Sequence, residues 1–592
     1  MPSSGRHALL ATASVAVALA AADTYVVVLA LTDMMAGVGI GVDALQRATP
    51  IISGFLLGYI AVLPLIGRLS DLLDRRRVLL GCLVVFVAGS AVTALATDLG
   101  VLVGGRVLQG VGGGGLVPAT LALVADLWPP DRRGTPLGVV GAVQELGSVL
   151  GPVLGAVILA WSGWRAIFWA NVFAGLILYA AVRALGTRSL PALPALPPPT
   201  PSSGPGVHRP AVETRATRGM VDSSGPGVHR PGVEIRATRR VAVLVLGGLG
   251  LALGGLALAQ PEVLVSDVQL GLAFVPFIGD SPLLTPIGVA ALVLLLSLAV
   301  ATAPRWWAVL RQVDLLGALL VAIALGSLVL TFASSDPEKE VVGPWGLALL
   351  PLGAAALAVL LWWHVRATDP LIPRRVVGRR GLRSVLVSSL VGAALVAVVV
   401  DVPVLARLTD AYDETGAALV LVRFLLAVPV GALIGGWSLH RLGDGLVAGV
   451  GLMLAATGLL AMSRWTLQSI QDPVPTTLVL VIVGLGMGLA LAPVNNAALA
   501  DSPEHAHGVA SALVVVARMV GMVVGLALLT SIGLNRYFEA ARRIPDPLDT
   551  DALVAAGVVQ VQTVFLGGAV AALLGAALAF TLGARRASVE AP

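Results

Sequence analysis

The stretch SVAVALAAADTYVVVLALTD, residues 14–33, places one carboxylate, Asp23, inside an apolar run that reaches from Ala8 to Leu31. A charge at that depth in lipid costs at least ~2.5 kcal/mol, and by some estimates more than ~10 kcal/mol. A residue of this kind is tolerated where it faces the interior of a helix bundle, so Asp23 is a candidate functional residue within a membrane span.

The bulk composition agrees with a membrane location. Of the 592 residues, 57% are hydrophobic and only 12% are charged, and the mean hydropathy is +0.94. Soluble globular proteins carry roughly 25% charged residues, so this chain has too little polar surface for a soluble fold. Almost every cation is Arg, with Lys339 as the single Lys, which indicates a high-GC genome.

Apolar segments recur along the chain and predict an all-α polytopic membrane protein with about sixteen spans. Each segment has about 20 residues, enough to cross ~30 Å of hydrocarbon. They lie near 8–32, 47–67, 77–97, 100–125, 134–160, 165–186, 241–259, 283–303, 313–333, 344–365, 381–400, 415–437, 445–463, 475–497, 507–534 and 560–583.

Arginine is distributed unevenly between alternate loops, which predicts the orientation of the chain. The Arg-bearing loops contain Arg68, Arg75, Arg76, Arg77, Arg132, Arg133, the linker after 186, Arg305, Arg311, Arg374, Arg375, Arg379, Arg380, Arg441, Arg585 and Arg586. The loops between them are richer in acids, whereas 535–559 mixes both signs. The multi-pass chain is therefore expected to have both termini in the cytoplasm.

A Pro-, Ser- and Arg-rich segment over 187–240 cannot bury a core and is expected to be disordered. It contains a tandem repeat, SSGPGVHRPAVETRATR at 202–218 and SSGPGVHRPGVEIRATR at 223–239. Two interpretations stay open: a local duplication in a tolerant loop, or an Arg-rich tether for anionic lipid head groups.

Five ionisable residues lie well within predicted spans: Asp23, Arg106, Glu145, Arg423 and Arg518. A low-dielectric cavity favours the neutral form of a carboxylate, so such a group can take up and release a proton near neutral pH. The alternatives are a permanent Asp23–Arg106 ion pair, a Glu145 wetted from the nearby loop, and a packing or interfacial role for Arg518.

Small residues recur three and four apart in GGRVLQGVGGGGLVP (104–118) and GSVLGPVLG (147–155). This spacing lets helices approach closely. The pair Gly151-Pro152 also permits helix bending. Ordinary tight packing is the alternative.

Four motifs in order resemble those of the major facilitator superfamily. GRLSDLLDRRR (67–77) resembles the family's loop signature, with Asp74 where Gly is usual, and a degenerate second copy is GWSLHRLG (436–443), with His440 at the acid position. RVLQG matches the Arg-x-x-Gln-Gly element, and GSVLGPVLG resembles the antiporter signature. The matching positions are Gly67, Asp71, Arg75, Arg76, Arg106, Gln109, Gly110, Gly147, Gly151, Pro152 and Gly155.

The resemblance implies two six-helix halves, residues 1–186 and 381–583, with a cytoplasmic tail at 584–592. Two linker helices, as in the fourteen-helix drug:H⁺ antiporters, would lie within 304–380. Residues 241–303 would then be an inserted hydrophobic hairpin, which guards an opening or contacts a partner.

Further segments, DTYVVV, QELGSVLGP, RFLLAVPVGALIGGW and VVVARMVGM, are similar to an actinobacterial subgroup of the family. That subgroup includes a mycobacterial exporter that works with a periplasmic lipoprotein, moves triacylglycerols and confers drug tolerance. The resemblance implies a proton-coupled exporter of lipids, drugs or both, in the plasma membrane of an actinobacterium. The short segment 464–477 departs from the subgroup, which has a long periplasmic extension there.

We expect the following roles for the site residues, of which the role of Asp71 is the one that the resemblance implies. Asp23, Glu145 and Arg106 would couple to protons, while Arg423 would latch the halves by pairing with Glu145, and Arg518 would be a cavity charge. Asp71 would close the cytoplasmic side against the helix start near Gly508, within a conformational-switch loop of Gly67, Asp71, Arg75 and Arg76. The helix-bending motif would consist of Gly147, Gly151, Pro152 and Gly155.

The sequence contains no GxxxxGK[ST] loop and no His/Cys/Glu cluster with metal spacing. We therefore expect a proton gradient as the drive, no cofactor or metal, no nucleic-acid partner, and a monomer. The alternatives are multidrug efflux without a lipid role, a non-transporting receptor or scaffold, and a membrane enzyme such as a lipid acyltransferase, which would want a His-Asp or comparable pair.

Overall fold

The computed structural model describes residues 3–40, 45–187, 246–260, 262–265, 271–277, 281–310, 312–333, 346–373, 378–409, 414–546 and 549–583. This described part contains helices and no strand. The tandem repeat, the rest of the predicted linker beyond Thr187, and the tail 584–592 lie outside the described residues.

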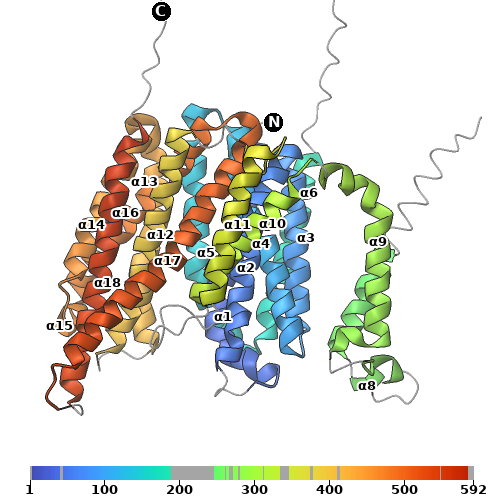
Figure 1. Ribbon diagram of the computed structural model, residues 1–592, viewed down its shortest axis with the longest axis horizontal. Helices are drawn as coiled ribbons and strands as arrows, with labels where there is room; N and C mark the ends of the chain where they lie inside the picture. Colours follow the sequence, from blue (N-terminus) through green and yellow to red (C-terminus); the bar gives the residue numbers. More distant parts are fainter. Residues whose placement is uncertain are drawn as a thin grey trace, which may run out of the picture.

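The long helices fall into two sets of six, separated by the linker helices. The first set is α1 (Ser3–Gly37), α2 (Leu45–Leu72), α3 (Arg75–Ala94), α4 (Leu99–Leu127), α5 (Gly134–Trp161) and α6 (Arg165–Thr187). The second is α12 (Arg379–Arg407), α13 (Glu414–Leu442), α14 (Asp444–Met462), α16 (Pro473–Asp501), α17 (His507–Ala541) and α18 (Thr550–Ala579), with the short α15 (Leu467–Gln471) before α16. The two sets lie side by side in Figure 1.

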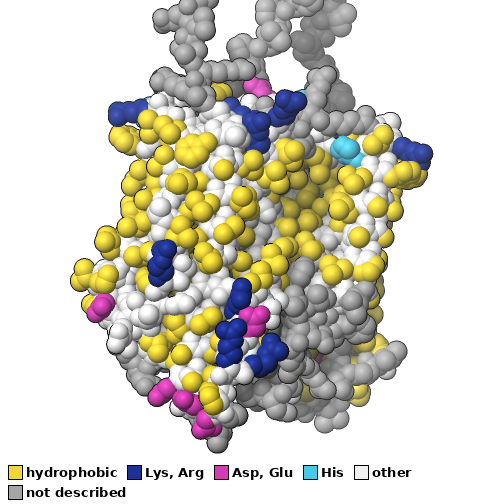
Figure 2. Space-filling view, turned by 60° about the vertical axis from the view of Figure 1, so that its left-hand side comes forward, with side chains coloured by type: hydrophobic (Ala, Val, Ile, Leu, Met, Phe, Trp, Pro, Cys, Tyr) yellow, Lys and Arg dark blue, Asp and Glu magenta, His cyan; other side chains and the backbone are white. Residues whose placement is uncertain are grey.

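Fourteen described helices are long and apolar enough to cross a membrane. Two shorter apolar helices, Leu246–Ala259 and Leu315–Thr331, occupy the other two of the sixteen predicted positions. The all-α polytopic fold is confirmed, and in the described residues a helix lies at each of the sixteen predicted positions, fourteen of them at full spanning length. Figure 2 shows hydrophobic side chains over the middle of one face, with basic side chains at its upper rim.

The linker helices and the inserted segment differ in how they pack. The linker helix α10 (Leu315–Ala333) pairs with α11 (Gly346–Arg366) and lies against α2 and α17. In the inserted segment, Leu246–Ala259 packs against α9 (Pro286–Leu310), where Gly250 approaches Leu295. This pair stands at the edge of the molecule in Figure 1 and reaches the first half through Leu258, which is buried in a cluster with Trp164.

Short polar breaks end one helix and start the next. Asp74 is the N-cap of α3, because its carboxylate accepts a hydrogen bond from the Arg77 amide at 3.0 Å, and Asp98 caps α4 in the same way through Val101. An N-cap of this kind typically stabilises a helix by ~1 kcal/mol. Asp74, where the motif that this loop resembles usually has Gly, therefore serves as the N-cap of α3.

Glycine contacts repeat between the halves and define which residues correspond. A Cβ on Gly110 of α4 would clash with the Phe55 carbonyl oxygen of α2, and a Cβ on Gly484 of α16 would lie 2.5 Å from that of Phe424 on α13. Because these crossings are equivalent, the two halves form an internal structural repeat.

The same comparison aligns the remaining inner helices. A Cβ on Gly147 of α5 would meet the Ala18 carbonyl of α1, and a Cβ on Gly521 of α17 would meet the Ser389 carbonyl of α12. Likewise Gly112 of α4 meets Phe86 of α3, and Gly486 of α16 meets Ala455 of α14. These two pairs of crossings relate α1 to α12, α5 to α17, α3 to α14 and α4 to α16, and the crossings at Gly110 and Gly484 relate α2 to α13.

The halves meet at two equivalent crossings on the end of the bundle that carries the Arg-rich loops. A Cβ on Gly67 of α2 would lie 2.7 Å from the Gly508 carbonyl of α17. At the counterpart crossing, a Cβ on Gly436 of α13 would lie 2.5 Å from the Gly134 carbonyl of α5. Backbone contact at both places closes this end of the molecule.

The close approach at Gly110 makes a stability prediction. Gly110→Ala forces a methyl group into the Phe55 backbone and is expected to destabilise the protein by ~1–3 kcal/mol, as overpacking does. Gly104 on the same helix is exposed, and a methyl group added to it would have nothing within 4 Å, so Gly104→Ala is the matched control. Thermal unfolding in detergent measures both, and equal melting temperatures for the two variants would contradict the close-approach argument.

Candidate functional site

A buried polar cluster lies inside the first half, centred on Asp23 of α1. Arg106 Nη1 donates to Asp23 Oδ2 at 2.5 Å, Gln109 Nε2 donates to Oδ1 at 2.9 Å, and Asn171 Nδ2 of α6 donates to the same oxygen at 2.5 Å. Asp23 and Arg106 are each 1% exposed. Three donors, one of them cationic, compensate the carboxylate, so a charge at this depth is stable in this conformation.

Arg106 and Gln109 are themselves held in place. Arg106 Nε donates to the Ile51 carbonyl at 3.3 Å, and the guanidinium lies 4.5 Å from the centre of the Phe55 ring. Gln109 also donates to Ser90 Oγ at 2.9 Å, because α3 approaches α4 closely where Gly89 faces the Gln109 backbone. The glycines of α3 and α4 therefore position the polar groups as well as the helices.

The second half replaces this cluster with apolar residues. By the repeat, Asp23 corresponds to Ala394, Arg106 to Leu480, Gln109 to Val483 and Ser90 to Leu459, and all four counterparts are 0% exposed. Buried ion pairs can often be replaced by well-packed apolar residues without loss of stability. The fold itself does not require a polar cluster at this position, which points to a functional reason for keeping one in the first half.

A second ion pair joins the two halves near the centre of the molecule. Glu145 of α5 and Arg518 of α17 approach to 3.3 Å between Oε1 and Nη1, and each residue is 9% exposed. Glu145 lies eleven residues into α5, ~16 Å along the helix at 1.5 Å per residue, so it is not at the loop.

The predicted Glu145–Arg423 latch is wrong for this conformation. Arg423 of α13 donates instead to Thr477 Oγ1 at 3.0 Å, within its own half. The cationic partner across the halves is Arg518, for which the sequence left packing, interfacial and cavity roles open.

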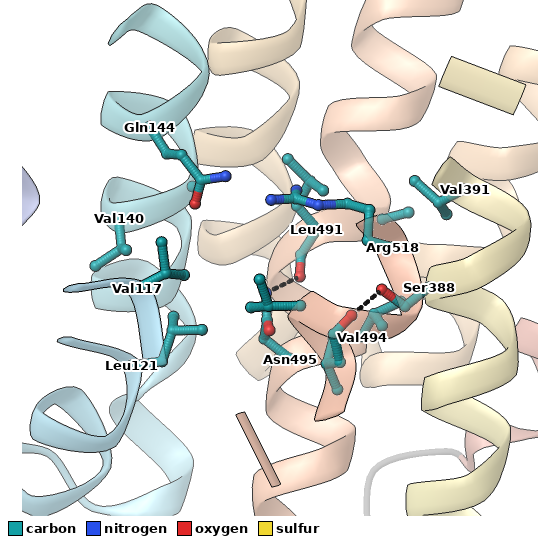
Figure 3. Close-up of a pocket in the computed structure, with 14 residues that line it drawn as sticks. Val117, Leu121, Val140, Gln144, Ser388, Val391, Leu491, Val494, Asn495 and Arg518 are labelled. Carbon is teal, nitrogen blue, oxygen red and sulfur yellow. Dashed lines mark hydrogen bonds between the residues drawn. The ribbon is translucent and has the colours of Figure 1, made fainter. Parts of the chain in front are cut away.

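Two small pockets flank the cross-half pair. One is lined by Thr24, Phe55, Tyr59, Glu145, Arg518 and Met522, among others, and has a volume of about 70 Å³. Its lining places Thr24, the neighbour of Asp23, near the cross-half pair. Figure 3 shows the other pocket, where Gln144 and Arg518 point toward one another from opposite halves.

At the Arg-rich end, Asp71 of α2 caps the first turn of α17 across the two halves. Its carboxylate accepts hydrogen bonds from the Gly508 amide at 2.7 Å and the Val509 amide at 3.0 Å. The positive end of the helix dipole and two backbone donors both favour a carboxylate there. The contact expected between Asp71 and the helix start near Gly508 is therefore present.

The basic residues of the same loop tie this region together. Arg75 lies 2.6 Å from Asp126 of α4, donates to the Ala122 carbonyl, and also donates to the Glu504 carbonyl of the second half at 3.1 Å. Arg76 donates to the Val182 carbonyl of α6 at 3.0 Å. The loop signature thus connects α2, α4, α6 and the start of α17.

The Gly-Pro motif of α5 packs closely against α1. A Cβ on Gly147 would clash with the Ala18 carbonyl, and one on Gly151 would clash with that of Ala22. Gly155 is also buried, and α5 stays a continuous helix through Pro152. The motif therefore packs α5 tightly against α1, while its predicted role in helix bending stays a prediction.

Asn171 and Ser90 were not predicted as site residues, because neither is ionisable and neither belongs to a motif in the sequence. Asn171 is an amide within the apolar run of α6 and is 7% exposed. Including amides within spans would have found it, since a buried amide also needs hydrogen-bond partners.

Comparison with known proteins agrees with this architecture. The Major Facilitator Superfamily model matches residues 13–364, more than half of the chain. A protein named triacylglyceride transporter from Mycolicibacterium smegmatis is 34% identical over 614 residues, covering 99% of this chain and 89% of its own length. One with the same name from Mycobacterium tuberculosis is 33% identical over 552 residues, covering 90% and 84% respectively.

Solved structures show the same fold at low sequence identity. The human organic anion transporter MFSD10 is similar with a TM-score of 0.53 and 14% identity, over 98% of this chain and 100% of its own. The proton:xylose symporter XylE gives a TM-score of 0.51 and 13% identity, over 95% of each chain. From the family match and these near full-length relatives, the chain belongs to the major facilitator superfamily of membrane transporters.

Proposed function

We propose that this chain is a proton-coupled exporter of hydrophobic compounds that works by alternating access, with triacylglycerol or a similar neutral lipid as the favoured cargo. The names of the mycobacterial relatives support the lipid, over 90–99% of this chain. The excess of Arg in alternate loops supports a cytoplasmic location for the closed end and for both termini.

The main support for proton coupling is the buried polar cluster, which is present in the first half and replaced by apolar residues in the second. Asp23, Arg106 and Gln109 are buried where the equivalent positions of the second half hold Ala394, Leu480 and Val483. Ionisable residues kept inside a membrane protein mark ion or proton pathways by default. A carboxylate that alternates between neutral and ionised forms supplies the coupling.

The cross-half pair links protonation to movement of the halves. Opening the Arg-rich end separates Asp71 from Gly508 and requires α5 and α17 to move, which strains the Glu145–Arg518 pair. Protonation of Glu145 removes its charge and hence its attraction to Arg518. Rocking of the halves about the central site then becomes easier, as in other transporters built from repeats.

The central lining suits an apolar cargo. Phe55, Met519, Met522 and Leu395 surround the pocket beside Glu145. Its volume of about 70 Å³ is well below the ~300–1,000 Å³ of typical ligand pockets, so cargo would be held in a conformation with the halves further apart.

Transport under an imposed pH gradient tests the proposal. In proteoliposomes, the wild type is expected to move labelled triacylglycerol faster with the gradient than without it. Asp23→Asn and Glu145→Gln are each expected to reduce the gradient-driven rate by at least ~10-fold, equivalent to ~1.4 kcal/mol or more. A cationic dye measured in parallel distinguishes lipid export from drug efflux.

Two controls separate function from folding. The side chain of Asp131 is 72% exposed in a short 3-10 helix between α4 and α5, so Asp131→Asn should transport like the wild type. The triple variant Asp23→Ala, Arg106→Leu and Gln109→Val places the residues of the second half at three of the four cluster positions and should fold while losing gradient-driven transport. Normal gradient-driven transport by that triple variant would refute the role of the cluster.

The Asp71 contact makes a separate conformational prediction. Asp71→Ala removes both acceptors from the α17 start, a loss of ~1–2 kcal/mol for an N-cap, so the population closed at the Arg-rich end should fall ~5–30-fold relative to the open one. Spin labels at the exposed Arg77 and His505, in a background lacking Cys82, report this separation by double electron–electron resonance. An unchanged distance distribution, with Asp131→Ala as the control, would count against the gate.

A further inference from the structure

We propose that Asp401 of α12 is a further proton-binding carboxyl, located in the second half of the molecule, whereas Asp23 and Glu145 belong to the first. The inference rests on the proposed proton-coupled transport and adds a site to it. Asp401 lies one residue beyond the predicted span 381–400, but α12 continues to Arg407, so the residue is within the helix.

Asp401 is buried without a partner. It is 4% exposed, and within the described ranges it forms no hydrogen bond and no ion pair. Asp23, by contrast, accepts from Arg106, Gln109 and Asn171. An isolated ionised carboxylate in such a site is very costly, and in practice the group becomes neutral.

The repeat shows that the fold does not need a carboxyl at this position. The glycine crossings that align α1 with α12 place Asp401 opposite Ala30, just as they place Asp23 opposite Ala394. Both alanines are 0% exposed. Each half therefore carries one buried acid on its first helix where the other half carries a buried alanine.

The position of Asp401 is apolar on both sides along its own helix face. One turn before it, Ala397 packs with Leu529 of α17 and Val564 of α18. One turn after it, Leu405 belongs to the core of the second half.

The charged side chains described on the helices packed against α12 are engaged or exposed elsewhere. Arg423 of α13 donates to Thr477, Arg518 of α17 pairs with Glu145, Arg536 of α17 pairs with Glu539, and His507 lies at the opposite end of α17. Asp551 of α18 is exposed, as is Arg407 on α12 itself. None of these neutralises a charge on Asp401.

The depth of Asp401 places it toward the end opposite the Arg-rich loops. Gly392 of α12 contacts the Arg518 backbone, and Asp401 lies nine residues further on, ~13 Å along the helix. Only six residues, ~9 Å, separate it from Arg407 at the end of α12. In a conformation that admits water, the neutral carboxyl would release its proton to that water and become a carboxylate; reprotonation reverses the step.

Infrared difference spectroscopy tests the site without relying on transport. Purified protein in lipid vesicles is stepped in pH, and the carboxylic C=O stretch of protonated side chains is followed in H₂O and D₂O. The difference between wild type and Asp401→Asn should contain one carboxylic band at neutral pH. Asp23→Asn, the matched variant from the first half, should leave that band in place.

An Asp401→Asn spectrum with undiminished carboxylic intensity would overturn the proposal. Asp401→Ala, which copies the buried Ala30, provides a second variant expected to fold. In proteoliposomes, both variants should move fewer protons per molecule of cargo than wild type, and an unchanged ratio would overturn the site's part in coupling. Failure of the wild type to move either triacylglycerol or the dye under the gradient would refute the proposed function, while the infrared band would still report on Asp401.

Discussion

The cost of a charge in a low-dielectric interior governs the first half of this protein. Asp23 can stay ionised because Arg106 and two amides converge on it from α4 and α6. That convergence in turn requires α4 to run against α2 and α3 at backbone distance, which the glycines at 89 and 110 allow. The glycines of α4 thus allow the close helix packing that brings Arg106 of the same helix to Asp23.

The repeat makes the asymmetry between the halves measurable. At the crossings between halves, Asp71 corresponds to His440 and Arg75 to Asp444. Asp71 accepts hydrogen bonds across the halves from α17. In the second half the acid of this region is Asp444, at the position that corresponds to Arg75. Asp444 is held within its own half by Arg380 and by Asn496 at 2.8 Å. The α2–α17 crossing therefore contains charge-assisted hydrogen bonds that depend on closure, while the α5–α13 crossing rests on backbone contact between Gly134 and Gly436.

Sequence reasoning reached the parts of the structure that depend on composition and on local motifs. Apolar length predicted the helices, and the motif around Asp71 predicted its contact with the start of α17. Partner choice could not be predicted, because whether Glu145 meets Arg423 or Arg518 depends on how α5 sits relative to two helices of the other half. Asp401 is not among the predicted site residues for a different reason: the predicted span 381–400 ends one residue before it, whereas α12 continues to Arg407.

The two ion pairs have different mechanical consequences. Asp23 and Arg106, 2.5 Å apart, both belong to the first half, so rocking of the halves as rigid bodies does not by itself separate them. Glu145 and Arg518 belong to different halves, so their separation changes whenever the halves move. By linkage, a conformation that separates Glu145 from Arg518 must favour protonation of Glu145, and protonation must favour that conformation to the same extent. Asp23 has no such direct link, but α1 packs against α5 at Gly147 and Gly151, and Thr24 lines the pocket beside Glu145. The α1–α5 contact is therefore one route from Asp23 to the cross-half pair, and its tight glycine packing leaves little room for the two helices to move independently. A second route runs from Arg106 to Phe55, which lines the same pocket as Glu145 and Arg518.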